Sequence, residues 1–149
     1  MFAAMTPTGR RLCLMIGVLA LAGMAVSGVS LKNHYSHDKT SYCELGQNFD
    51  CDIVNRSSYS SIAGVPVAGI GILGYAVLGF LAVFYRDKDE TPTYMFVASL
   101  SGLAFALYLT YVEKYILATW CILCLSSLAL ISTITILASV VLAQSRRHA

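Results

Sequence analysis

Four of the five cysteines in this chain fall into two pairs whose spacing suits thiol–disulfide chemistry. Cys121 and Cys124 form a C-x-x-C sequence directly after Trp120, and Cys43 and Cys51 lie close together in an earlier polar stretch. Residues i and i+3 share one face of a helix, so the two sulfurs of a helical C-x-x-C can bond across one turn. At a helix N-terminus the backbone N–H groups stabilise a thiolate. The pattern therefore predicts electron transfer in which a thiolate of one pair attacks the disulfide of the other.

The elements that must position these cysteines are predicted to cross a membrane. Hydrophobic residues make up 57% of the chain and charged residues only 12%, about half the charged fraction of a soluble domain. A crossing needs about 20 mostly apolar residues. Charged residues are absent from four blocks of at least that length: 12–31, 57–85, 91–112 and 115–145. We therefore expect an all-α membrane protein, a four-transmembrane-helix bundle with helices at about 12–31, 64–85, 93–114 and 119–143.

One membrane domain, 1–149, accounts for the whole chain in this interpretation. The first apolar block could be a secretory signal, but it is longer than the usual signal core, so a retained helix is expected. Four crossings place both termini on one side, which carries six Lys or Arg residues in short segments against four on the other side. The positive-inside rule then predicts cytoplasmic termini. The polar loop 32–63 and both cysteine pairs would face outward.

Within the outward loop, residues 57–63 are uncharged yet too polar to span a membrane. We expect them to form a short helix on the membrane surface. Pro66 would then lie in the first turn of the second long helix, where its missing N–H costs nothing. Packing between helices is the expected role of the small residues that crowd this region: Gly64, Gly69, Gly71, Gly74 and Gly79.

Each cysteine pair has a simpler interpretation when it is taken alone. A C-x-x-C in an apolar helix can be a packing feature, because cysteine is a common small buried residue. The loop pair can be a structural staple, because disulfides are expected in an oxidising compartment. Four cysteines on one predicted face of the membrane favour a relay over two separate accidents. Cys13 lies at the opposite end of the first helix without a partner, which indicates packing.

The remaining polar residues point to no metal and no nucleic acid. His34, His37 and Asp38 could join the loop cysteines as metal ligands, but a zinc ion would occupy the thiols, so no metal site is predicted. Glu113 could carry protons within the membrane, as acidic residues in spans often do. An interfacial charge pair with the adjacent Lys114 is the favoured interpretation. No basic stripe suggests a nucleic-acid partner.

The combination of these motifs resembles the bacterial branch of the vitamin K epoxide reductase family. The resemblance covers the chain from the first helix to the fourth. It rests on the loop from Cys43 to Pro66, the glycine-rich helix that follows, and the sequence Trp120-Cys121-Ile122-Leu123-Cys124. That family carries paired loop cysteines, a serine or threonine six residues after the second of them, and the C-x-x-C of the fourth helix. All are present here, as Cys43, Cys51, Ser57, Cys121 and Cys124.

The resemblance implies a four-helix bundle around a quinone of the ubiquinone, menaquinone or vitamin K type, capped by the outward loop and its short helix. Cys43 would exchange disulfides with a thioredoxin-like (DsbA-like) partner, Cys51 would relay to Cys121, and Cys124 would face the quinone. The resemblance also implies two quinone-binding residues, Ser57 near the head group and Tyr59 closing the pocket. Ser57 could equally be the N-cap of the 57–63 helix.

Two departures from the family pattern change what is expected. The animal enzymes use an asparagine and a tyrosine to contact the head group, and Val67 and Leu128 stand at those places here. The pocket is therefore expected to differ from that of an epoxide reductase. Many bacterial members also carry a fused thioredoxin-like domain, whereas this chain ends at Ala149. We expect a separate partner protein.

The function expected from these features is a thiol–quinone oxidoreductase of the bacterial inner membrane that supports disulfide formation in exported proteins. The alternative within the same chemistry is a vitamin K quinone or epoxide reductase that runs on thiol electrons. The alternative from another class is a structural four-span protein of the claudin type with a loop disulfide, which would not explain the C-x-x-C. A small multidrug transporter would need an acidic residue in the first helix, and none is present there.

Overall fold

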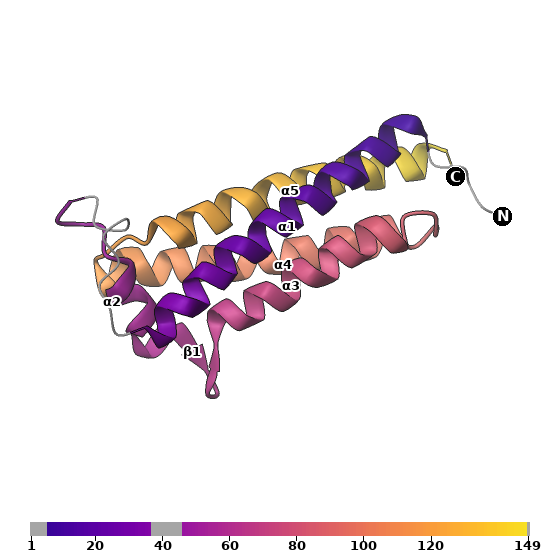
Figure 1. The fold of residues 1–149 in the computed structure, drawn as a ribbon. Helices are drawn as coiled ribbons and strands as arrows, with labels where there is room; N and C mark the ends of the chain where they lie inside the picture. Colours follow the sequence, from indigo (N-terminus) through magenta and orange to yellow (C-terminus); the bar gives the residue numbers. More distant parts are fainter. Residues whose placement is uncertain (1–5, 37–45, 149) are drawn as a thin grey trace.

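The computed structural model of the protein describes residues 6–36 and 46–148, and in these it shows a bundle of long helices. Figure 1 shows the helices side by side, with the start of α1 and the end of α5 at one end of the bundle and the short helix α2 at the other. Within the described residues, four helices are long and apolar enough to cross a membrane. The long helices are α1 (Pro7–Tyr35), α3 (Val67–Phe84), α4 (Thr91–Val112) and α5 (Ile122–Arg147). The expected all-α four-span architecture is confirmed.

The first helix extends beyond both ends of the predicted range 12–31. The side chain of Thr6 caps it by accepting a hydrogen bond from the Gly9 N–H at 3.2 Å. Pro7 follows in the first turn, where its fixed φ suits a helix start. The prediction began at the first uncharged residue, whereas a helix begins where its end groups are satisfied. Arg10 and Arg11 are therefore helical and flank the apolar segment.

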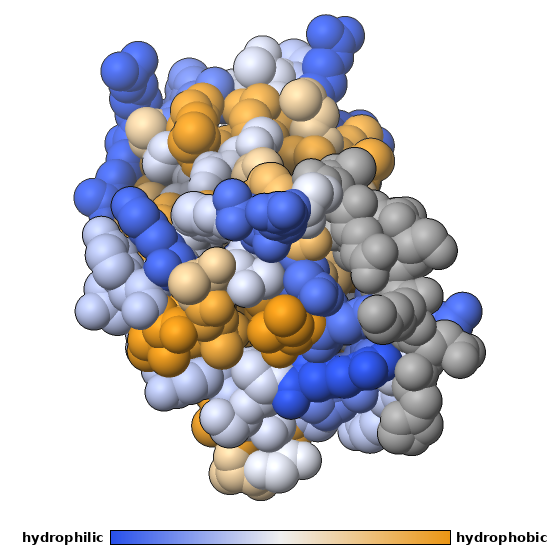
Figure 2. Space-filling view, turned by 90° about the vertical axis from the view of Figure 1, so that its left-hand side faces the viewer, coloured by the Kyte–Doolittle hydropathy of each residue, from blue (hydrophilic) through white to orange (hydrophobic). Residues whose placement is uncertain are grey.

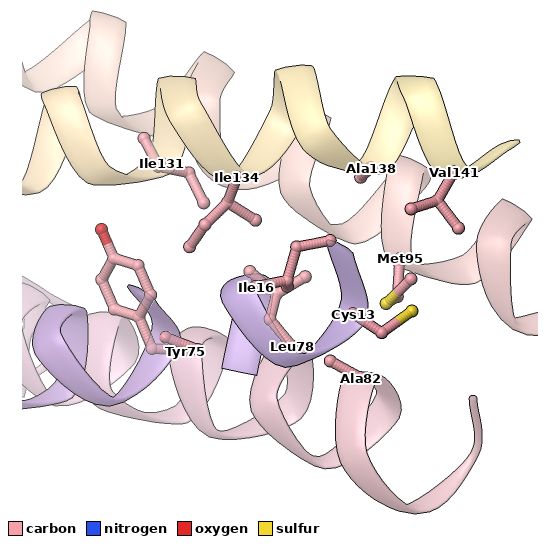
Figure 3. Packing of buried hydrophobic residues seen from close by; sticks show 11 residues of the cluster. Cys13, Ile16, Tyr75, Leu78, Ala82, Met95, Ile131, Ile134, Ala138 and Val141 are labelled. Carbon is pink, nitrogen blue, oxygen red and sulfur yellow. The ribbon is translucent and has the colours of Figure 1, made fainter. Parts of the chain in front are cut away.

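The helices pack through small residues and one apolar core. α1 lies against α3 and α5, and α4 lies against α5. A Cβ added at Gly23 of α1 would stand 2.4 Å from the ring of Tyr75 on α3, so the two helices can approach this closely only with glycine there. Figure 3 shows the core between the helices, formed by Cys13, Ile16, Ala20, Tyr75, Leu78, Ala82, Met95, Ile131, Ile134, Ala138 and Val141.

The glycines of α3 divide into two groups. A Cβ at Gly71 would lie 2.9 Å from the Ser27 hydroxyl, and one at Gly79 would lie 3.5 Å from Ala20, so both serve packing as expected. At Gly69 and Gly74 nothing stands within 4 Å of the added atom. For these two the expected packing role is wrong.

The segment that covers one end of the bundle, residues 51–66, is called the cap here, and it differs from the expected surface helix at 57–63. Its helix is α2 (Cys51–Arg56), which ends before the predicted one begins. The Asp50 side chain accepts hydrogen bonds from the Asp52 and Ile53 N–H groups at 3.0 and 3.2 Å, so the helix starts at Cys51. Ser57 is extended and ends α2, with its hydroxyl donating to the Val54 carbonyl at 2.8 Å. The expected N-cap role of Ser57 is wrong.

The segment after α2 forms a small hairpin rather than a helix. A 3-10 turn, η2 (Ser58–Ser60), leads into β1 (Ser61–Ile62), which pairs antiparallel with β2 (Val65–Pro66). Ala63 and Gly64 join the strands with φ values of 52° and 82°. A two-residue hairpin turn of this kind needs positive φ at both positions, which Gly64 supplies without strain. Pro66 consequently precedes α3 instead of lying within its first turn.

Candidate functional site

The loop that carries Cys51 is hydrogen-bonded to the residue before Cys121. The Trp120 N–H donates to the Asn48 carbonyl at 2.8 Å, and the Asp50 N–H donates to the Trp120 carbonyl at 3.1 Å. Phe49 and Trp120 thereby form a parallel bridge. Cys121 directly follows Trp120, and Cys51 comes two residues after Phe49.

The two cysteines beside the bridge are buried together. Cys51 and Cys121 are both 0% exposed and belong to one apolar cluster with Val54. Leu117, Ile122, Leu123 and Cys124 pack against that cluster. A loop cysteine and a helix cysteine thus lie in one cluster that is closed to water.

The C-x-x-C lies at the N-terminus of α5, as the sequence predicted. Cys121 is the N-cap residue and Cys124 lies in the first turn. Both are free thiols. A hydrogen bond from the Cys124 thiol lowers the pKa of the Cys121 thiol, burial opposes this, and the backbone N–H groups of Cys124 and Leu123 add to the lowering. Cys121 is therefore the residue of this pair with the greater thiolate character.

A cavity of about 520 Å³ lies between the long helices and the cap. That volume falls in the range of small-molecule sites, which is roughly 300–1,000 Å³. Its wall is mainly apolar, with contributions from all four long helices. Cys124 lines the cavity, whereas Cys121 is not among the described residues that line it. The polar and ionisable side chains on the wall are Ser27, Ser30, His34, Asn55, Ser57, Tyr59, Ser60, Tyr75, Ser101, Glu113, Cys124 and Ser127.

The structure places both predicted pocket residues, Ser57 and Tyr59, on the cavity wall. Val67, expected at the place of the asparagine of the animal enzymes, lines the cavity as well. Cys51 is disulfide-bonded. Cys43, the expected contact for a partner protein, lies outside the described residues.

Hydrogen bonds attach the cap to α1 at the mouth of the cavity. The Ser30 hydroxyl donates to the Asn55 side-chain oxygen at 2.7 Å. A ring nitrogen of His34 is bonded to the Asn55 carbonyl and lies 3.3 Å from the Ser60 hydroxyl. His34, considered above as a metal ligand, therefore serves to hold α2 and η2 against the bundle.

Glu113 belongs to the site, and the expected surface charge pair with Lys114 is wrong. The Glu113 side chain is 1% exposed and lines the cavity. One of its oxygens, Oε2, accepts a hydrogen bond from the Cys121 N–H at 3.2 Å. The Lys114 ammonium instead lies 5.2 Å from the centre of the Tyr115 ring. An acidic residue at the end of an apolar block is the sequence signal for a proton carrier, an interpretation that on the sequence alone was placed second to the charge pair.

The chain reversal after α4 explains how Glu113 reaches Cys121. α4 continues into a π-helix, η3 (Glu113–Leu117), and Ala118 then adopts a left-handed conformation with φ 50°. The Thr119 N–H donates back to the Glu113 carbonyl at 3.1 Å. This turn brings the start of α5 over the carboxyl group of Glu113. π-helical turns of this kind are frequent at functional sites.

Figure 2 views the end of the molecule that carries α2 and shows hydrophobic residues beside hydrophilic ones. Apolar side chains of the cap are exposed there, with Ile53 at 50%, Ile62 at 47% and Val65 at 49%. Such a mixed surface suits a position at the membrane–water boundary.

Comparison with known protein families identifies one match. A family model described as "Vitamin K epoxide reductase family" matches residues 14–139. The match includes the loop 32–63 and the C-x-x-C. No individual curated protein matches the chain.

Proposed function

The chain belongs to the vitamin K epoxide reductase family, and from this premise we propose that it is a disulfide-forming thiol–quinone oxidoreductase. Family membership makes it a multi-pass membrane protein with oxidoreductase chemistry on thiols and quinones. The direction of electron flow and the role of each cysteine are our proposal. The observation that carries it is the shared burial of Cys51 and Cys121 beside the Phe49–Trp120 bridge, with Cys124 turned to the cavity.

Electrons enter through the loop pair. The dithiol of a thioredoxin-like (DsbA-like) partner reduces a disulfide between Cys43 and Cys51, and the partner leaves with its own disulfide restored. The partner is a separate protein in this proposal. Its substrates are exported proteins, which it oxidises in turn.

The second exchange moves the electrons inward. The Cys51 thiolate attacks the Cys121 sulfur of a Cys121–Cys124 disulfide, and Cys124 departs as a thiolate. Cys43 then gives its proton to the Cys124 thiolate and attacks the Cys51 sulfur, which restores the loop disulfide and releases Cys121 as a thiolate. The helix pair now holds both electrons. The burial of Cys51 and Cys121 supports this order, because the exchange can proceed without exposing either thiol to water.

The cavity residues fit a quinone. A quinone offers a flat apolar ring with two carbonyl acceptors, and it supplies an acceptor for two electrons and two protons. The wall is mainly apolar with a few polar groups, which matches such a ligand. The hydroxyl of Tyr59 is the proposed donor to the head group. Ser57 positions it, since its carbonyl accepts the Ser60 N–H at 3.0 Å and thereby closes the turn that carries Tyr59.

Orientation follows from charge. Arg10 and Arg11 lie near the start of α1 and Arg146 and Arg147 at the end of α5, and these ends lie together in Figure 1. We propose that this end is cytoplasmic. The cap and the cysteine site then face outward, in a bacterial inner membrane. Thiol pairs there meet the oxidising compartment in which disulfides form.

Quinone reduction by the purified protein tests the proposal. The lipid-reconstituted protein is mixed with a reduced thioredoxin-like protein and with a ubiquinone or menaquinone analogue. We expect quinone reduction that depends on the donor protein and disappears in Cys51→Ala. A correctly folded protein that reduces no quinone with this donor would contradict the function.

A further inference from the structure

The relay described so far leaves the buried carboxyl group of Glu113 unused. Glu113 is 1% exposed, and its Oε1 atom is buried without a hydrogen-bond partner. A carboxyl group in such a place is costly unless it is paired or can exchange a proton. Oε2 is satisfied by the Cys121 N–H. The Glu113 carboxyl group is thus held in place through Oε2, while Oε1 remains available to take up or release a proton.

The surroundings of this carboxyl group connect the thiol pair with the cavity. Glu113 lines the cavity together with Cys124. The carboxyl group also interacts electrostatically with the Cys124 thiol. The group is therefore hydrogen-bonded to one residue of the C-x-x-C, through the Cys121 N–H, and coupled by charge to the other. No other carboxylate lines the cavity among the described residues.

We propose that Glu113 is the proton carrier of this site, taking the proton of the Cys124 thiol and delivering it to the electron acceptor in the cavity. The proposal rests on the proposed function. It adds a residue outside the four cysteines and a route by which protons accompany the electrons.

The proton and electron balance requires such a carrier. The reduced pair enters the step as a Cys121 thiolate and a Cys124 thiol. Forming the S–S bond removes two electrons and the one remaining thiol proton, and reducing a quinone takes up two electrons and two protons. The Glu113 carboxylate takes the Cys124 proton and passes it on, so it ends the step as it began. The second proton comes from water at the outward face.

The other ionisable groups on the cavity wall are placed for other roles. His34 is bonded to the Asn55 carbonyl in the cap, and the Tyr75 hydroxyl donates to the Ser127 carbonyl at 3.0 Å. Tyr59 lies in η2, also in the cap. Lys114, the neighbour of Glu113 in the chain, is turned to Tyr115. Of the described carboxyl groups, Glu113 alone is hydrogen-bonded to the C-x-x-C and lines the cavity together with Cys124.

The first test compares quinone turnover in three variants. Glu113→Gln keeps an oxygen that can accept the Cys121 N–H but cannot carry a proton. We expect it to lose about 10²-fold or more in turnover, as for removal of a general acid–base group. Glu113→Asp should recover part of the rate. Glu90→Gln is the matched control, since Glu90 is exposed at the opposite end of α4, and it should leave turnover unchanged. Full turnover in Glu113→Gln would overturn the proposal.

The second test needs no quinone. The ionisation of Cys121 in the reduced protein is followed by thiolate ultraviolet absorbance, as the difference from the same protein carrying Cys121→Ser. The charge of Glu113 opposes a Cys121 thiolate. Glu113→Gln should therefore move the ionisation midpoint of Cys121 to lower pH, by about one unit. A purely structural Glu113 would leave this midpoint in place, because glutamine can keep the hydrogen bond.

The two tests separate this proposal from the proposed function. If the unaltered protein reduces no quinone, the proposed function fails, and the coupling of Glu113 to the thiols is decided by the titration alone. If turnover falls in Glu113→Gln without a shift in the midpoint, Glu113 does not exchange protons with the thiol pair, and the proposal is wrong.

Discussion

Cys13 and Cys121 are both completely buried, yet they differ in their position within a helix and in the hydrogen-bond donors beside the sulfur. Cys13 lies inside α1 near the end of the bundle that carries the termini, packed among Ile16, Ala82 and Met95. Cys121 lies at the opposite end, at the N-cap position of α5, with backbone N–H groups and a second thiol beside it. Burial alone therefore does not decide whether a cysteine is inert.

The difference comes from unsatisfied donors. In the interior of a helix each backbone N–H is bonded to the carbonyl four residues earlier, so no free backbone donor lies beside Cys13. At a helix start the first N–H groups have no partner within the helix and can stabilise a negative charge. Cys121 is placed there, and the Cys124 thiol on the next turn adds a further donor. The bundle provides reactivity at the end that carries α2 and packing at the other.

The largest expected effect contrasts Cys124 with Cys13. Cys124→Ala should abolish quinone-linked turnover, because the helix pair can no longer form its disulfide. Cys13→Ala should keep turnover and lower the free energy of unfolding by about 1 kcal/mol through the lost packing. Turnover with the lipid-reconstituted variants and thermal unfolding measure the two effects. Substantial turnover in Cys124→Ala would place the electron transfer elsewhere.

The next effect concerns the contact between loop and helix. Replacing Cys43 and Cys124 together by alanine removes both competing partners, so a Cys51–Cys121 disulfide should accumulate in nearly all molecules. The burial of both residues in one cluster is the reason. Mass spectrometry of non-reduced peptides detects the bond. Cys51 and Cys121 persisting as free thiols under oxidising conditions would show that the relay takes another path.

A smaller effect tests the source of thiolate character at Cys121. The hydrogen bond from the Cys124 thiol is the main cause that lowers the Cys121 pKa, so its removal in Cys124→Ala should raise that pKa. The thiolate is lost as pH falls through the pKa, and in the variant this loss should occur at a pH about one unit higher. Thiolate absorbance against pH gives the midpoint.

The matched variant for this titration is Cys124→Ser. A serine hydroxyl can still donate to the Cys121 sulfur, so the shift should be smaller than in Cys124→Ala. Equal midpoints in the unaltered protein and Cys124→Ala would assign the lowering to the helix N-terminus instead.

The smallest expected effect tests the cap. Asp50→Ala removes the side chain that starts α2 and should cost about 1 kcal/mol of local stability. The start of α2 would then unfold more often, so that Cys51 would spend less time in the cluster with Cys121. Turnover should fall about fivefold. Asp50→Asn is the control, because asparagine caps a helix about as well as aspartate. Equal loss in both variants would point to the charge rather than to the cap.

The long helices and their order along the chain could be predicted from the sequence. Long blocks without charged residues predicted the four crossings, because the apolar interior of a membrane excludes charge. The spacing of Cys121 and Cys124 after Trp120 predicted a reactive pair at a helix start, and α5 begins there. These features depend on local composition and spacing, so one sequence is enough to find them.

The helix of the cap was predicted in the wrong place. The structure of a short polar segment depends on its helix-capping side chains and its turns, which overall composition does not show. Nothing in residues 57–63 distinguishes a surface helix from a hairpin by hydrophobic pattern. The side chain of Asp50 begins the helix earlier, and the Ala63–Gly64 turn ends any helical course.

Only the tertiary structure decided which side chains meet. Glu113 and Lys114 are neighbours in the chain, but consecutive residues point in different directions around a helix, and the turn at Ala118 brings Cys121 over Glu113 alone. Likewise the bridge between Phe49 and Trp120, 71 positions apart in the numbering, sets Cys51 in the cluster of Cys121. Such contacts arise from the path of the backbone between distant segments. By itself the sequence specified the helices and the thiols, whereas the packing of the cap on the bundle determined how they are joined.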